Sequence, residues 1–275
     1  MFKLKLKKKQ RKMIMKRILY SVCAVLFFFS FTYSAMAASN QAIHWGFKKG
    51  GNGQQAEAGQ ELDKLLADNG AFYKGSSKEK VLYLTFDNGY ENGYTASVLN
   101  TLKKEKVPAA FFITGHYLKS APDLVKRMNK EGHIIGNHSW HHPDLTQVSD
   151  EKLREELKLV EKETARLTKQ KQMKYLRPPR GIFSERTLKV AREEGYTHVM
   201  WSLAFVDWQT NNQKGWQYSY DNIMKQIHPG AVILLHTVSK DNAEALPKAI
   251  KELKKQGYRF ESLDDYRKKQ KRISA

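Results

Sequence analysis

From residue 81 onward, short apolar runs alternate with longer segments in which apolar residues recur every three or four positions. Runs of the first kind predict buried strands, and segments of the second kind predict amphipathic helices. The predicted strands cover residues 81–86, 109–114, 133–136, 175–177, 196–201, 203–206, 231–235 and 258–261. The predicted helices cover residues 60–66, 94–105, 122–131, 149–168, 184–194, 221–227 and 243–256. Repeated strand–helix units imply parallel strands with right-handed crossovers, so we expect an α/β fold, either a barrel or an open doubly wound sheet.

The domain organisation follows from the same pattern. No repeat or linker divides the alternating part, so we expect one domain at residues 81–266, with residues 38–80 as an amino-terminal extension packed on it. Residues 267–275 form a basic tail that we expect to fray. In the longest predicted helix, 149–168, the charged positions between the apolar ones are expected to form a solvated face.

The amino terminus has the pattern of a secretory signal peptide. Residues 1–17 carry nine Lys and Arg and no acid, an apolar run follows at 18–34, and Ala35-Met36-Ala37 offers a cleavage site. An uncleaved membrane anchor is the alternative, but the apolar run is near the lower limit for a spanning helix. We therefore expect a signal peptide at residues 1–37, export across the cytoplasmic membrane, and no stable membrane anchor after cleavage.

Cysteine usage and charge narrow the function classes. The only cysteine, Cys23, lies in the predicted leader, so the exported chain has no disulfide, no thiolate nucleophile and no Cys-ligated zinc. Of the 48 Lys and Arg, nine lie in the leader, which leaves a formal net charge of about +11. This surface favours polyanions, and outside the cytosol these are cell-wall carboxylates and phosphates rather than nucleic acid. The alternative is a basic surface that is merely solvated.

Polar side chains gather where the predicted strands end. Asp87 and Asn88 follow the first strand, the position at which parallel α/β folds carry their chemistry, although Asp-Asn-Gly is also a common turn. Three histidines occur within residues 138–142 (HSWHH), directly after another strand. Two imidazoles three or four residues apart on one helical turn can hold a divalent metal. We therefore predict a metal or proton-transfer site, with structural histidines as the alternative.

Two later segments supply further groups. His236 ends a very apolar strand, which suits either a buried core histidine or a general acid, and Asp207 can hold that imidazole in orientation. Arg177 and Arg180 belong to RPPRG, in which prolines stiffen the backbone that carries two guanidinium groups. A hydrolytic metal site needs two or three protein ligands, an open position and a base, and these segments can provide them together.

The ordered set of motifs resembles the polysaccharide deacetylase family, also called carbohydrate esterase family 4. The motifs are TFDNG (85–89), HSWHH (138–142), RPPRG (177–181), VDW (206–208) and LLH (234–236), and the resemblance spans residues 81–265. The longer stretches TFDNGYENGYT, HWGFK and LLHTVSKDNAEAL are similar to the branch that deacetylates N-acetylmuramic acid in peptidoglycan. That branch supplies muramic δ-lactam to the spore cortex.

The resemblance implies a distorted (β/α) barrel of the NodB-like type and a divalent metal. Zinc is the metal we expect, with manganese, cobalt or nickel as alternatives. The implied roles are a base at Asp87, a base-orienting arginine at Arg177, an acid at His236, a carboxylate that tunes it at Asp207, metal ligands at Asn88, His138 and His142, an oxyanion donor in the backbone N–H of Arg180, and a substrate contact at Trp208. Asn88 departs from the family pattern, which has an acid there, so we expect weaker metal binding.

The substrate prediction rests on the likeness to the muramic branch, and Arg180 adds a further hypothesis, for which a simple surface arginine is the alternative. Muramic acid differs from glucosamine by a lactyl carboxylate, and a guanidinium pairs with a carboxylate through two hydrogen bonds. We therefore predict a monomeric metal-dependent hydrolase that acts on peptidoglycan glycan strands. Two alternatives stay open: a deacetylase of chitin, xylan or N-acetylglucosamine polymers, and a catalytically silent protein that binds wall glycan. The tryptophans available for glycan binding are Trp140, Trp201, Trp208 and Trp216.

Overall fold

The structure is a computed structural model that describes Met13 and residues 38–170 and 172–273. Apart from Met13, the predicted signal peptide at residues 1–37 lies outside the described residues. Residues 38–275 form one compact unit. No helix in the described ranges combines the length and the hydrophobicity that crossing a membrane requires.

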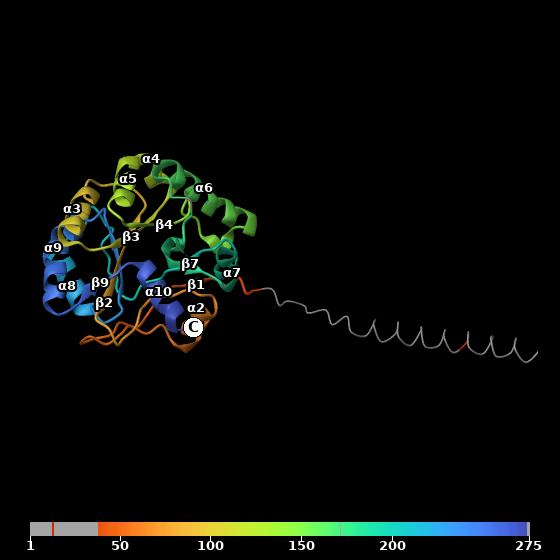
Figure 1. The fold of residues 1–275 in the computed structure, drawn as a ribbon, viewed down its shortest axis with the longest axis horizontal. Coiled ribbons are helices and arrows are strands. Elements are labelled where there is room, and N and C mark those ends of the chain that lie inside the picture. The colour runs from red at the N-terminus through yellow and green to blue at the C-terminus, as the bar shows by residue number, and fades with distance from the viewer. Residues whose placement is uncertain (1–12, 14–37, 171, 274–275) are drawn as a thin grey trace, which may run out of the picture. The chain divides into compact units, whose positions relative to one another are not determined.

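A parallel sheet of seven strands forms the centre of this unit (Figure 1). Its path runs β7-β5-β4-β3-β2-β8, and β9 adds to β2. The strands are β2 (Val81–Asn88), β3 (Ala109–Ile113), β4 (Ile134–Asn137), β5 (Tyr175–Leu176), β7 (Thr197–His198), β8 (Val232–His236) and β9 (Arg259–Phe260). All pairs in the sheet are parallel, as the repeated strand–helix units predicted.

The segment after β7 joins the two edges of the sheet. At one end, the backbone N–H of Val199 donates to Leu176 O in β5 at 2.9 Å. At the other end, Leu203 pairs with Ile233 of β8 and accepts a hydrogen bond from Leu234 N at 2.9 Å. The sheet is therefore curled into a distorted barrel, which confirms the predicted fold class. The separate strand predicted at 203–206 is wrong, because only Leu203 pairs there, and the strand predicted at 196–201 is reduced to Thr197–His198.

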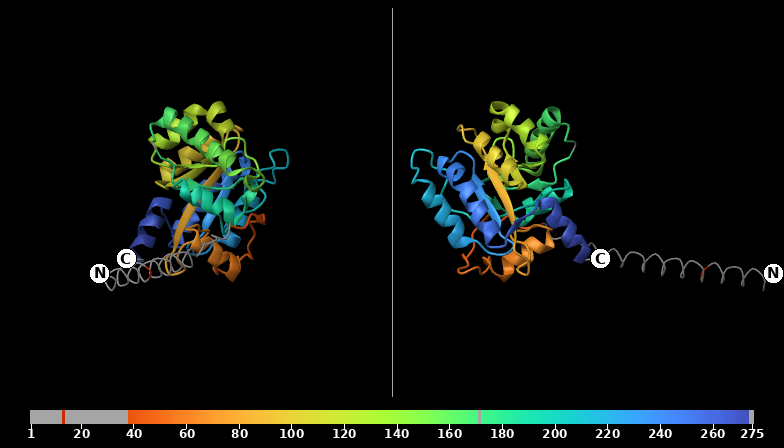
Figure 2. Two further views of the ribbon diagram at one scale, coloured as in Figure 1. Left: turned by 90° about the vertical axis from the view of Figure 1, so that its right-hand side faces the viewer. Right: turned by 60° about the vertical axis from the view of Figure 1, so that its left-hand side comes forward.

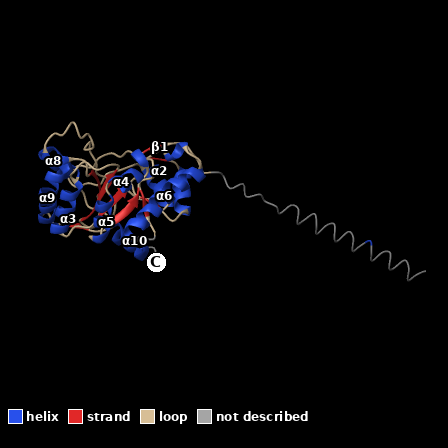
Figure 3. Cartoon of the chain, turned by 90° about the horizontal axis from the view of Figure 1, so that it is seen from above, coloured by secondary structure: helices blue, strands red, loops and turns tan. Residues whose placement is uncertain are grey.

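Helices surround the strands (Figure 3). They are α3 (Thr95–Glu105), α4 (Gly115–Ser120), α5 (Pro122–Lys130), α6 (Asp150–Thr168), α7 (Glu185–Glu193), α8 (Trp216–Gln226) and α9 (Lys240–Lys255). Side-chain oxygens of Thr114, Ser149, Ser184 and Ser239 accept hydrogen bonds from the first turns of α4, α6, α7 and α9. Three of these helices differ from the sequence prediction. Helix α4 was not predicted, and α8 and α9 begin at Trp216 and Lys240, before their predicted first residues.

Alternation along β2 separates two cores. Leu82, Leu84 and Phe86 pack in the large cluster between the sheet and its helices. Val81 and Tyr83 belong instead to a second cluster on the other face, inside the barrel. The same alternation places Asp87 on the inner side of the strand and Asn88 on the outer side.

The carboxyl-terminal helix α10 (Leu263–Ile273) closes one end of the barrel. Leu263 and Tyr266 pack into the inner cluster, and the Tyr266 ring stacks on Phe72 with centroids 3.9 Å apart. Figure 2 shows α10, in dark blue, at the same end of the domain as the orange segment 38–80. The expectation of a fraying basic tail is wrong for residues 267–273, because the helix continues through them.

Residues 38–80 are packed on the barrel. They form β1 (Ile43–His44), which pairs antiparallel with β6 (Ile182–Phe183), and the helix α2 (Gln60–Asp68). The indole N–H of Trp45 donates to Trp201 O at 3.0 Å. This bond ties the amino-terminal segment to the strand segment that closes the barrel.

Candidate active site

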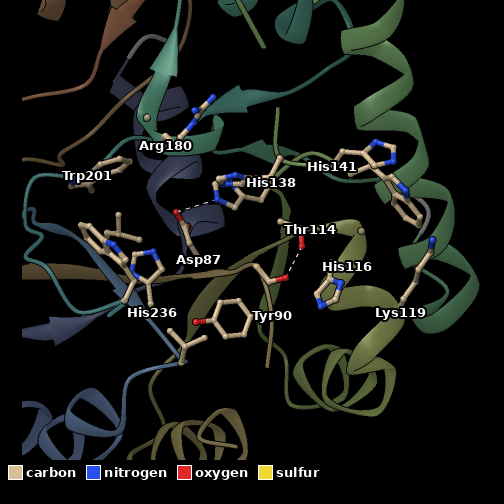
Figure 4. A pocket seen from close by; sticks show the side chains of 18 residues that line it. Asp87, Tyr90, Thr114, His116, Lys119, His138, His141, Arg180, Trp201 and His236 are labelled. Carbon is tan, nitrogen blue, oxygen red and sulfur yellow. Dashed lines mark hydrogen bonds and ion pairs between the residues drawn. The ribbon is translucent and has the colours of Figure 1, made fainter. Parts of the chain in front are cut away.

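A pocket of about 970 Å³ opens where the parallel strands end (Figure 4). It is lined by side chains from the carboxyl ends of β2, β4 and β8 and from the loops that follow β3 and β5. Six predicted site residues line it: Asp87, His138, His142, Arg180, Trp208 and His236. The other three, Asn88, Arg177 and Asp207, do not line it, and each contacts the protein behind or beside the pocket wall.

Asp87 is held from behind by Arg177, which is completely buried inside the barrel. Arg177 Nη1 donates to Asp87 Oδ1 at 2.8 Å, and Nη2 donates to Thr85 Oγ1 at 2.9 Å. The guanidinium also lies 4.2 Å from the Phe112 ring centroid. Burial is the largest effect and raises the pKa of Asp87, but the Arg177 charge, the nearby His138 and His236 and the Arg177 hydrogen bond together outweigh it, so this pKa lies below its ordinary value. Asp87 is therefore a buried, ionised carboxylate with one oxygen left toward the pocket.

A tight loop, and not a helical turn, brings His138 and His142 together. Ser139 and His142 have φ values of +61° and +59°, so the chain turns through left-handed conformations that non-glycine residues seldom adopt. Asn137 Oδ1 accepts from Ser139 N at 2.9 Å, and Ser139 Oγ accepts from His142 N at 3.0 Å. The two imidazole centroids lie 4.8 Å apart. The predicted convergence is present, but the predicted helical geometry is wrong.

Hydrogen bonding fixes how His138 faces the pocket. Its Nδ1 lies 2.8 Å from the Arg177 carbonyl oxygen, which only accepts, so Nδ1 carries the proton. Its Nε2 lies 3.5 Å from Asp87 Oδ2. Burial lowers the pKa of His138 below its ordinary value. His142 stays open to solvent on one side, yet desolvation and then the His138 charge lower its pKa to about 4. Both rings are therefore neutral at neutral pH, which is the metal-binding form of imidazole.

Asn88 is not brought to this pair of imidazoles. Its side chain is fully buried on the outer face of β2, where Nδ2 donates to Thr237 Oγ1 at 2.6 Å. Thr237 also accepts from Thr95 Oγ1 at 2.8 Å, so the amide belongs to a buried polar network beneath α3. Asn88 Oδ1 has no hydrogen-bond partner in the part of the chain that the structure describes. The prediction that Asn88 stands beside the histidines is not met here, because successive side chains of a strand point to opposite faces.

The donor set decides how well a divalent cation fits. Within the described residues no group of three His, Cys, Asp or Glu side chains is placed to hold a metal. The two neutral imidazoles at His138 and His142 are nevertheless adjacent, and imidazole suits zinc and other late divalent ions. Asp87 is already paired with Arg177. The site therefore fits a cation held through two uncharged nitrogens, with its other positions open.

His236 and Asp207 form a compact pair on the other side of Asp87. Asp207 accepts from the backbone N–H of His236 at 2.8 Å and lies 2.7 Å from its ring Nδ1. Asn242 Nδ2 donates to the same carboxylate at 2.5 Å. Desolvation lowers the pKa of His236, but the charge and hydrogen bond of Asp207, together with the Asp87 charge, outweigh it, so the pKa is raised above its ordinary value. Trp208 covers the imidazole with ring centroids 5.5 Å apart.

Arg180 lies on the rim of the pocket, in the turn η2 (Pro179–Gly181). Its φ of +57° is left-handed, and its side chain is exposed. A methyl group added at Gly181 would lie 2.8 Å from the Trp201 ring, so only glycine permits this approach. The turn therefore fixes the Arg180 backbone against Trp201, which also lines the pocket.

One residue of the site was missed from the sequence. Glu156 of α6 is completely buried and accepts from the backbone N–H of His141 at 2.7 Å. The expected solvated face of this helix is therefore wrong at Glu156. The available signal was its position between Leu153 and Leu157, since a carboxylate on an apolar stripe needs a partner.

Comparison with known proteins identifies the class. The family model for polysaccharide deacetylase matches residues 74–199. The chain is also 55% identical over 243 residues to the peptidoglycan-N-acetylmuramic acid deacetylase PdaA of Bacillus subtilis, covering 88% of this chain and 92% of the relative. The chain therefore belongs to the polysaccharide deacetylase family, carbohydrate esterase family 4, and is an enzyme of that class.

Further similarities also extend over most of the chain. An uncharacterized 30.6 kDa protein of Geobacillus stearothermophilus is 62% identical over 250 residues, covering 90% of this chain and 94% of the relative. The solved structure of Bacillus subtilis PdaA superimposes with a TM-score of 0.83 at 56% identity, covering 84% of this chain and 99% of that one. A family 4 carbohydrate esterase from Bacillus anthracis gives a TM-score of 0.73 at 53% identity, covering 85% and 99%.

Proposed function

We propose that this protein removes the N-acetyl group from N-acetylmuramic acid residues of peptidoglycan. The observation that carries the proposal is the pair of opposed groups in one pocket: the Asp87 carboxylate paired with Arg177 and the His236 imidazole paired with Asp207. The 55% identity to a peptidoglycan-N-acetylmuramic acid deacetylase supports the choice of substrate.

The chemistry explains why both groups are needed. An acetamide is a poor electrophile, and its nitrogen is a poor leaving group unless it is protonated. Asp87 takes the proton of the attacking water, because its carboxylate is ionised and faces the pocket. His236 donates a proton to the departing nitrogen, because Asp207 raises its pKa and so favours the imidazolium form. Arg177 and Asp207 position these two groups without lining the pocket.

His138 and His142 would hold a divalent cation, which we propose to be zinc, with manganese, cobalt or nickel as alternatives. When bound, it supplies Lewis-acid activation of the acetyl carbonyl. The two imidazoles are uncharged, and Asn88 points to the other face of the strand, so the cation is expected to be labile. We propose the backbone N–H of Arg180 as an oxyanion donor, for which a good donor contributes about 2.7–4 kcal/mol. Trp208 forms the wall of the substrate site above His236.

The Arg180 side chain is proposed to select muramyl substrates by pairing with the lactyl carboxylate. Arg180→Leu should lower kcat/KM on muramyl strands about tenfold more than on chito-oligomers, because a charge-assisted bond is lost on the first substrate only. Arg180→Lys is the matched control, because lysine keeps the positive charge but cannot form two parallel hydrogen bonds to a carboxylate. It should recover part of the loss in kcat/KM. Equal losses on both substrates would reject this role.

The biological setting remains part of the proposal. We infer that the protein is exported, acts as a monomer on peptidoglycan strands, and contributes to muramic δ-lactam formation in the spore cortex. The basic charge of the exported chain suits a polyanionic wall.

The direct test is acetate release from glycan strands that contain N-acetylmuramic acid, with zinc, manganese, cobalt or nickel added in turn. Wild-type protein should release acetate, and Asp87→Asn should release about 10²–10⁴-fold less, the contribution of one acid–base group. Unchanged acetate release by Asp87→Asn would exclude the proposed base. Strand binding without any acetate release by wild-type protein would favour a silent glycan-binding protein.

A further inference from the structure

A second histidine–carboxylate pair occupies the pocket and is built in the same way as the first. Glu156 accepts from the backbone N–H of His141 at 2.7 Å and lies 2.7 Å from its ring Nδ1. Asp207 binds the backbone N–H and Nδ1 of His236 in the same manner. Glu156 is fully buried, whereas the His141 side chain is 62% exposed and lines the pocket.

This arrangement leaves one ring atom of His141 for a ligand. The buried carboxylate fixes Nδ1 as a donor, and Nε2 has no hydrogen-bond partner among the described residues. The proposed chemistry at Asp87 and His236 does not use His141. Figure 4 shows His141 on the opposite side of the pocket from His236.

A cation stands beside His141 at the same end of the pocket. Lys119 of α4 lies with Nζ 5.0 Å from the centroid of the Trp140 ring, and the Trp140 and His141 rings are 6.5 Å apart. Gly115 packs so closely under Trp140 that an added methyl group would lie 2.2 Å from its ring. Trp140 is therefore wedged in place and holds Lys119 by a cation–π contact. Lys119 forms no ion pair within the described part of the chain.

We propose that His141 and Lys119 form a second glycan subsite, which binds another acidic sugar unit of the same strand, beyond the one that is deacetylated. His141 Nε2 hydrogen-bonds the sugar, and the Lys119 ammonium pairs with its carboxylate. Glu156 holds His141 and Trp140 holds Lys119, so little side-chain conformational entropy is lost on binding. The pocket volume of about 970 Å³ far exceeds what one acetamido group fills. This subsite deepens the proposed function and rests on it for the identity of the strand.

The test uses two substrates and matched variants of the whole protein. The substrates are peptide-free glycan strands with muramic carboxylates, and the same strands after reduction of the carboxylates to alcohols. Lys119→Gln should raise KM about tenfold on the acidic strands, with little change in kcat and little effect on the reduced strands. Lys119→Arg should restore the KM, and Lys130→Gln, a lysine outside this pocket, should leave it unchanged. The salt dependence of the wild-type KM should weaken in Lys119→Gln.

His141→Ala separates ligand binding from loop support, because its backbone bond to Glu156 is kept. It should raise KM on both strands with kcat nearly unchanged, and it should lower the melting temperature, because the buried Glu156 carboxylate keeps only Lys152 as a charged partner in the chain as the structure describes it. A fall in kcat with an unchanged KM would assign His141 to loop support and overturn its place in the subsite. An equal change of KM on acidic and reduced strands in Lys119→Gln, or no change on either, would overturn the charge contact.

Direct binding keeps the subsite testable if the proposed function fails. Calorimetry with acidic strands and the Asp87→Asn variant measures Kd without turnover. A Kd that Lys119→Gln weakens about tenfold in that background supports the subsite even if wild-type protein releases no acetate. A Kd that does not respond to Lys119→Gln rejects the subsite, whatever the outcome of the acetate assay.

Discussion

Replacing Asp207 by Asn tests how the protein keeps its proposed acid protonated. Asp207 accepts from both the backbone N–H and the ring Nδ1 of His236, and its charge is what raises the pKa of that imidazole. Asparagine keeps one acceptor oxygen but turns an N–H₂ group toward a donor. One donor of His236 therefore loses its partner, at a cost of about 1–3 kcal/mol in stability.

The effect on catalysis follows from the sign of the pKa shift. His236 acts in its protonated form, so kcat falls as the pH rises through its raised pKa. In Asp207→Asn the charge that contributes most to raising this pKa is lost while burial still lowers it, so this fall moves to lower pH. We expect kcat near neutral pH to drop about 10²–10⁴-fold, the full contribution of a general acid. The assay is the pH profile of acetate release from muramyl strands.

Asp241 provides the matched control. It is also a buried carboxylate, and it accepts from the backbone N–H groups of Lys214 and Gly215 at 2.7 and 2.8 Å, away from the pocket. Asp241→Asn should lower the unfolding free energy by a similar amount and leave the basic limb of the pH profile in place. If the basic limb of Asp207→Asn coincides with that of wild type, His236 is not the group that the limb reports, and the reasoning fails.

Three further changes probe other parts of the site. Arg177→Met leaves the Asp87 charge buried without its partner, so we expect the free energy of unfolding in urea to fall by about 3–5 kcal/mol. The acidic limb of the pH profile of kcat/KM should move to higher pH, because the pKa of Asp87 rises. An acidic limb at the same pH as in wild type would contradict the pairing. Calorimetric zinc titration should show weaker binding for His142→Ala, whereas equal affinity would exclude that imidazole as a ligand. Gly115→Ala places a methyl group against the Trp140 ring and should raise KM for glycan strands. An unaltered KM would contradict the claim that Gly115 fixes the position of Trp140.

The strand positions that carry chemistry could be predicted, because polar residues at the ends of parallel strands need no tertiary information to be recognised. Asp87, His138 and His236 end or follow β2, β4 and β8, and the register of the sheet brings these ends to one edge. The motif resemblance supplied the rest of the expected set. The roles of these residues stay predictions that the experiments above address.

Side-chain direction and long-range partners could not be predicted from local pattern. Asn88 and Asp87 are neighbours in sequence, yet the pleat sends the amide to Thr237 behind the strand. Glu156 lies fifteen residues from His141, and nothing near it in sequence shows that α6 crosses under that loop. The strand at Thr197–His198 is short because the segment after it changes partner to close the barrel, which depends on the whole sheet.

The most direct measurement of the central claim is mass spectrometry of the sugars in glycan strands after incubation with the purified protein. The account predicts that acetyl groups disappear from muramic acid residues, that glucosamine residues keep theirs, and that neither change occurs with Asp87→Asn. Loss of acetyl from glucosamine alone, or the same muramic product with Asp87→Asn, would contradict it.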